Sequence, residues 1–87
     1  MKTNFTFKND ELSRQFERLT PDDVRQMARD FISEYGSTLP FFSRNIGLHP
    51  TVIGNWLRGK QVLGERSLKR IFAYLAEVYP KYQEYIR

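Results

Sequence analysis

The chain has 87 residues, of which 40% are hydrophobic, 15% aromatic and 28% charged, and its net charge is +4 at pH 7. This length and composition predict one folded domain with a modest core, and they exclude a disordered tail or a catalytic cleft between two domains. The sequence has no cysteine and a single histidine, His49, so we expect no disulfide, no metal site and no cofactor.

Two helices are predicted in the first 36 residues. The first covers residues 9–19 and carries three apolar residues at helical spacing, Leu12, Phe16 and Leu19. The second begins at Pro21, because Thr20 is a favourable N-cap, proline suits the first helical position and two aspartates follow it. Gly36 is placed to end this helix in a left-handed conformation.

Three further helices are predicted downstream, and the first two of them are short and separated by a tight turn at Gly47. The short helices cover residues 39–46 and 50–58. The longer one covers residues 65–79 and is stopped by Pro80. No strand pattern of comparable length occurs in the sequence.

These elements predict an all-α fold: a small helical bundle containing a helix-turn-helix, with an extra N-terminal helix and a short C-terminal extension. We expect residues 1–20 to form an arm and a short helix, residues 21–79 to form the helix-turn-helix domain, and residues 80–87 to form the extension. No run of about 18 uncharged apolar residues and no signal-peptide pattern occurs, so membrane insertion and secretion are not expected.

The basic residues are unevenly distributed along the chain. Residues 1–40 carry six Lys/Arg against seven Asp/Glu, whereas residues 41–75 carry six Lys/Arg against Glu65 alone. A polyanion such as DNA is a suitable partner for the basic segment, because each neutralised phosphate releases condensed counterions. A solvated basic helix face explains the same charge, and charge alone favours that simpler interpretation.

Residues 50–58 separate into two faces when they are placed on a helix. The apolar face carries Ile53, Trp56 and Leu57, and the opposite edge carries Thr51, Asn55 and Arg58. The turn before this helix suits a close approach of two helices, since Gly47 leaves the corner open, Ser43 is small and Leu48 can fill the corner. The pattern is typical of a helix-turn-helix whose second helix offers a polar edge to a partner.

In these features the chain resembles the lambda-repressor/Cro-like (XRE-type) helix-turn-helix family. The resemblance rests on residues 38–60, TLPFFSRNIGLHPTVIGNWLRGK, and on the motif residues Phe42-Ser43, Ile46-Gly47-Leu48, Ile53, Trp56 and Arg58-Gly59-Lys60. It extends over residues 21–79 without insertion or gap. It implies a DNA-binding transcriptional regulator, a repressor of bacterial or phage type, in the cytoplasm of a bacterial cell or phage-infected host. In this family the second motif helix enters the major groove, and a dimer reads two half-sites.

The polar edge of the 50–58 helix supplies the candidate base contacts. Asn55 can pair with adenine through two hydrogen bonds, and Thr51 or Val52 can contact a thymine methyl group. A solvated helix face explains the same polar residues, but the presence of Arg58 in the same arc favours DNA.

Cationic residues in and beside the motif supply the candidate phosphate contacts, which set affinity and register. These are Arg44, Arg58 and Lys60. His49 precedes the helix and is expected to act as an N-cap or as a hydrogen-bond donor to a phosphate. Enzyme activity is not expected, because this histidine has no neighbouring nucleophile to activate. The complete set of expected DNA-binding residues is His49, Pro50, Thr51, Val52, Asn55, Arg58, Lys60 and Arg44.

An alternative function is a protein-interaction module that keeps the helix-turn-helix scaffold with little or no DNA binding. Three departures from the family weaken the expectation of base-specific readout: Leu39-Pro40 replaces a common glutamine, Pro50 stands where polar readers are frequent, and Leu57 replaces a common acidic residue. Pro50 and the missing polar head of the helix favour the alternative, whereas the basic segment favours DNA. Phe41 and Val52, together with the C-terminal tyrosines, would then contact the protein partner.

Aromatic residues concentrate towards the C-terminus. The group consists of Tyr74, Tyr79, Tyr82 and Tyr85, with Val78 and Ile86. Tyrosine is favoured at interfaces, and an element after the core helices commonly mediates dimerisation in the resembling family, so we expect a homodimer through this group. Phe5 and Phe7 can join the same surface. In the alternative interpretation the tyrosine rings pack over the first helices of their own chain.

Overall fold

The structure, a computed structural model, describes residues 10–79, and every regular element in that range is an α-helix. The helices are α1 (Asp10–Glu17), α2 (Pro21–Tyr35), α3 (Leu39–Ile46), α4 (Pro50–Leu57) and α5 (Glu65–Val78). The predicted all-α bundle is therefore confirmed, and each predicted helix is present with its ends displaced by two residues or fewer. The N-terminal arm up to residue 9 and the extension from residue 80 lie outside the described residues.

The start and stop signals of α2 act as the sequence predicts. Thr20 Oγ1 accepts a hydrogen bond from the Asp23 N–H at 3.1 Å, and Asp23 Oδ2 accepts one from the Thr20 N–H at 2.8 Å. This reciprocal capping box satisfies N–H groups that a helix start leaves without partners. Gly36, with φ at +64°, ends the helix in the left-handed region that favours glycine.

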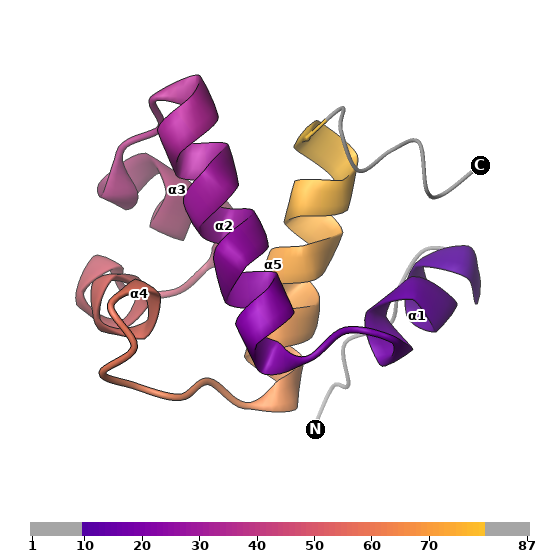
Figure 1. Ribbon diagram of the computed structural model, residues 1–87. Coiled ribbons are helices and arrows are strands. Elements are labelled where there is room, and N and C mark those ends of the chain that lie inside the picture. The colour runs from indigo at the N-terminus through magenta and orange to yellow at the C-terminus, as the bar shows by residue number, and fades with distance from the viewer. Residues whose placement is uncertain (1–9, 80–87) are drawn as a thin grey trace, which may run out of the picture.

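A central pair of helices, α2 and α5, packs side by side and organises the bundle (Figure 1). α3 and α4 lie on one side of this pair, and α1 lies on the other side against α5 (Figure 1). The Phe16 ring of α1 packs against α5, with its centroid 5.8 Å from that of the Phe72 ring.

At the surface of α1, hydrogen bonds from Arg14 and then Gln15 lower the pKa of the Glu11 carboxyl. Among the helices of residues 10–79, none is long and apolar enough to cross a bilayer.

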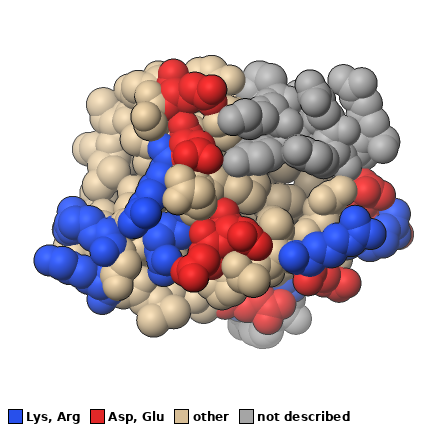
Figure 2. Space-filling model, in the orientation of Figure 1, with Lys and Arg blue, Asp and Glu red and all other residues tan. Residues whose placement is uncertain are grey.

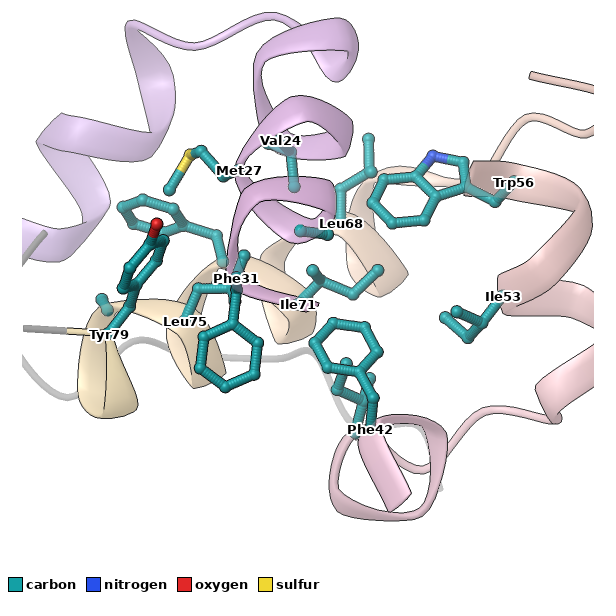
Figure 3. Close-up of a cluster of buried hydrophobic side chains, with 14 of the residues drawn as sticks. Val24, Met27, Phe31, Phe42, Ile53, Trp56, Leu68, Ile71, Leu75 and Tyr79 are labelled. Atoms are coloured by element: carbon teal, nitrogen blue, oxygen red, sulfur yellow. The ribbon is translucent and has the colours of Figure 1, made fainter. Parts of the chain in front are cut away.

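The core lies between the central pair and the two short helices (Figure 3). Its fully buried large side chains are Val24 of α2, Phe42 of α3, Ile53 and Trp56 of α4, Ile71 and Leu75 of α5, and Tyr79. The predicted burial of Ile53 and Trp56 is therefore confirmed. Because both side chains enter the core from α4, the opposite edge of that helix is turned towards solvent.

The two described tyrosines of the C-terminal group pack within their own chain. Tyr79 is only 1% exposed; its ring lies 5.5 Å from that of Phe31, and its hydroxyl donates to the Glu34 carboxylate. The half-buried Tyr74 meets the same Phe31 ring at 6.0 Å. The alternative interpretation, packing over the chain's own helices, is therefore correct for Tyr74 and Tyr79. The other predicted members, Tyr82, Tyr85, Ile86, Phe5 and Phe7, lie outside the described residues.

Candidate nucleic-acid interface

α3 and α4 are joined by a tight turn of the kind that the sequence predicts. Gly47 has φ at +91°, and its N–H and that of Leu48 donate to the Ser43 carbonyl at 2.8 and 3.1 Å. The left-handed backbone explains the glycine, because other L-residues are strained there. Leu48 packs against the core from this corner, and the Ser43 side chain is completely buried, as expected of a residue between two close helices.

A second small residue, Gly54, allows the close approach from the side of α4. A Cβ atom at this position would lie 3.2 Å from Leu39 Cδ2 of α3, which is tighter than ordinary van der Waals contact. The sequence analysis predicts the role of Ser43 but not that of Gly54. The signal that could have found Gly54 is a glycine in the interior of a predicted helix, where it lowers helix stability and often marks a close approach.

The N-terminal end of α4 is capped by His49. Its Nδ1 atom accepts a hydrogen bond from the Thr51 N–H at 3.1 Å, which confirms the N-cap role. A ring nitrogen that accepts carries no proton, so the neutral imidazole has its proton on Nε2. The exposed His49 side chain therefore keeps one N–H donor for an outside group at the head of α4.

The C-terminal end of α4 is closed by main-chain hydrogen bonds. Lys60 N–H donates to the Asn55 carbonyl at 2.8 Å and Gly59 N–H donates to the Trp56 carbonyl at 3.0 Å. This pair of bonds, with Gly59 at φ +78°, is a Schellman motif. It explains why Arg58-Gly59-Lys60 closes the helix at this point.

Two arginines of α2 bind the same end of α4. Arg25 Nε donates to the Trp56 carbonyl at 2.8 Å, and Arg29 Nε donates to the Leu57 carbonyl at 2.8 Å. The Arg25 guanidinium also lies 5.9 Å from the Trp56 ring centroid. Positive charge at a helix C-terminus is stabilising, because the last carbonyls form the negative end of the helix dipole. These arginines fix α4 relative to α2, and no pattern in the sequence predicts this role.

The polar edge of α4, which we define as Thr51, Asn55 and Arg58, faces outward as predicted. Thr51 and Arg58 are exposed, whereas Asn55, Val52 and Pro50 are all half-buried. Within the edge, Arg58 Nη2 donates to Asn55 Oδ1 at 2.9 Å. The structure therefore brings together the predicted base contacts, Thr51 and Asn55, and joins Arg58 to them.

A cation trio, Arg44, Lys60 and Arg70, surrounds the helix-turn-helix. Arg44 stands in the last turn of α3, Lys60 follows the end of α4, and the Arg70 guanidinium of α5 occupies the space that a Cβ on Gly47 would need. Within residues 10–79 the three side chains form no ion pair and no hydrogen bond. Arg44 and Lys60 were predicted as phosphate contacts; Arg70 was not among the predicted residues.

The charges are arranged differently on the two sides of this region. Figure 2 shows basic side chains gathered over α4 and the turn that follows it, and acidic side chains along α2. The acidic residues of α2 are Asp22, Asp23, Asp30 and Glu34. The surface of α4 is therefore the part of this face that favours an anionic partner.

Among the described residues, no three His, Cys, Asp or Glu side chains lie together in a way that could hold a metal ion. Comparison with protein-family models, with curated proteins and with solved structures found no match for this chain. The interpretation of the site therefore depends on its own geometry and charge.

Proposed function

We propose that the chain is a DNA-binding transcriptional regulator of the lambda-repressor/Cro-like type, and that α4 enters the major groove of duplex DNA. The observation that carries the proposal is the outward polar edge of a rigidly held helix, surrounded by a cation trio without partners in the described part of the chain. Cations that serve only to stabilise a fold are usually paired, as Arg25 and Arg29 are. Unpaired cations around a polar helix suit phosphates around a groove.

In this proposal regulation is by occupancy. Thr51 and Asn55 lie against base edges, while the cation trio and the Nε2–H of His49 bind phosphates at the borders of the groove. The fixed orientation of α4 keeps the reading residues in register with these phosphate contacts. The protein would act in the cytoplasm of a bacterial cell or phage-infected host, as a repressor that denies the site to other proteins.

Titration of a labelled random-sequence duplex at several salt concentrations tests the proposal. We expect binding at low salt and a log–log salt slope of about −2.7 or steeper, as three or more phosphate contacts require. Arg14→Ala is a matched control, because Arg14 pairs with Glu11 on α1 on the other side of the central helix pair and should leave the slope unchanged. Absence of binding at low salt would contradict the proposed function.

A protein-interaction module is the second candidate, and exposed Phe41 on α3 favours it. This ring is 52% exposed, although large aromatic side chains usually bury most of their surface. Of the other residues expected to contact a protein, Val52 is half-buried, and Tyr74 and Tyr79 pack within the chain. If the Phe41→Ser variant binds duplex DNA with unchanged affinity, the surface around Phe41 is distinct from the DNA-binding edge of α4.

Homodimerisation is part of the proposal, because two copies that read two half-sites discriminate better than one. The expected surface is now reduced to Val78, which is 38% exposed, and to residues beyond the described range. Sedimentation of the intact chain and of a chain lacking residues 80–87 should show a dimer and a folded monomer, respectively. A monomeric intact chain would contradict this part of the proposal.

A further inference from the structure

The hydrogen bond between Arg58 and Asn55 determines which atoms of the Asn55 amide remain available. A guanidinium has only donors, so the amide atom 2.9 Å from Arg58 Nη2 must be the carbonyl oxygen. The Asn55 NH2 group then points away from Arg58, and its side-chain donors have no partner within residues 10–79. The pair therefore offers hydrogen-bond donors from both residues to an outside group.

The path of the Arg58 side chain places its charge on α4 itself. Its Nη1 and Nη2 atoms lie 3.6 and 3.7 Å from the position of a Cβ on Gly54, one helical turn earlier. The guanidinium therefore lies back along the helix, beside Asn55, and does not extend past the turn at Gly59. This position is on the polar edge, where base contacts are expected, whereas the cation trio belongs to α3, to the turn after α4 and to α5.

We propose that Asn55 and Arg58 act as one donor-only reading unit that selects guanine over adenine in the major groove. The inference rests on the proposed function and names the base that α4 reads. Guanine presents two acceptors, N7 and O6, on its major-groove edge, and a unit with only donors satisfies both. This differs from the sequence-based expectation of adenine, which assumes that the Asn55 carbonyl is free.

Adenine is disfavoured by the same geometry. Its edge combines the N7 acceptor with the N6 amino donor, and an asparagine pairs with it only by accepting from N6 through the amide oxygen. The Asn55 oxygen already accepts a hydrogen bond from Arg58. If its second lone pair accepted from adenine N6, the adenine amino group would lie next to the guanidinium, and two donor groups would face each other. Removing Arg58 should free the oxygen and restore an ordinary asparagine, which suits adenine.

Selection from a duplex pool with 20 random base pairs, followed by sequencing, tests the inference. The wild-type chain should enrich sites with a G·C pair whose replacement by A·T weakens binding roughly 5- to 150-fold. Arg58→Ala should move the preference at that position from guanine to adenine, and Asn55→Ala should reduce it. Lys60→Ala is the matched control, because it removes an exposed cation next to α4 that has no side-chain partner within residues 10–79; it should weaken all duplexes alike.

The outcomes distinguish this inference from the proposed function. An adenine preference in the wild-type chain would overturn the inference alone. So would an Arg58→Ala chain that loses affinity uniformly without changing its base preference, because Arg58 would then be a phosphate contact. If no duplex is recovered even at low salt, the proposed function and the inference fall together. Circular dichroism of each variant verifies that the helical fold is retained.

Discussion

The arginines of α2 and the cation trio around α4 are chemically alike and are used differently. Arg25 and Arg29 donate to the last carbonyls of α4, and Arg25 also pairs with Asp22 at 2.6 Å. The trio of Arg44, Lys60 and Arg70 makes no such bond within the part of the chain that the structure describes. The first group holds α4 in place, and the second has no partner of its own among residues 10–79.

This difference shows what a charge count along the sequence measures. Residues 1–40 are nearly neutral and residues 41–75 carry six basic residues against one acidic residue. Three of these six basic residues lie in or beside the helix-turn-helix and three lie on α5, and the count assigns no role to the arginines of the neutral segment. Their role depends on partners more than 25 residues away in sequence.

The largest expected effect comes from removing the cation trio together. The triple variant Arg44→Ala, Lys60→Ala, Arg70→Ala removes the three proposed phosphate contacts, so the log–log salt slope of duplex binding should become shallower by about 2.7. The melting temperature should stay unchanged, because the described structure shows no bond from these side chains. Titrations at several salt concentrations and thermal circular dichroism measure the two quantities.

A charge control belongs with this experiment. Arg14→Ala with Arg18→Ala removes two cations at α1, beyond the central helix pair, and should alter the slope little. If this variant loses as much slope per charge as the triple variant, binding depends on net charge and not on the surface of α4. The cation trio would then have no special part in duplex binding.

The next effect in size is on stability. Arg25→Ala with Arg29→Ala removes hydrogen bonds from charged donors to the end of α4 and should lower the free energy of unfolding by about 2 kcal/mol. Urea denaturation followed by circular dichroism measures the loss. Duplex affinity should fall as well, because α4 loses its contact with α2. Arg14→Ala, which breaks only an exposed ion pair with Glu11, should cost much less.

A smaller and more selective effect is expected from two glycines. Gly47→Ala and Gly36→Ala each place a side chain at positive φ, where the left-handed backbone costs roughly 1–2 kcal/mol. A Cβ at Gly36 meets nothing within 4 Å, whereas a Cβ at Gly47 displaces the Arg70 guanidinium. Both variants should therefore be destabilised, and only Gly47→Ala should also bind duplex DNA more weakly. If the two variants bind duplex DNA with equal affinity, Arg70 is not a DNA contact.

The fold could be predicted because its signals are local. Thr20 and Gly36 cap α2 through atoms within a few residues, and the burial of Ile53 and Trp56 follows from helical periodicity. The polar edge of α4 was predicted for the same reason, since the residues opposite a buried edge must face outward.

The remaining parts of the site depend on contacts that leave no pattern in the sequence. The partner of Arg25 is a main-chain carbonyl 31 residues away, and every residue type carries such an acceptor. The bond from Arg58 to Asn55 is the exception, because it spans three residues and helical spacing would have allowed it to be predicted. Tyr79 illustrates a different difficulty, because tyrosine suits an interface and a buried position with a hydroxyl partner equally well.

The main-chain nature of the contact between α2 and α4 has a consequence for how this protein can evolve. The acceptors at residues 56 and 57 are carbonyls, so they persist whatever side chain these positions carry. Mutations at outward positions such as Thr51 and Asn55 can therefore accumulate while α4 stays docked. New target sites would be acquired by exchanging a few surface residues on an unchanged support, which also makes α4 a suitable segment for libraries of altered binding preference.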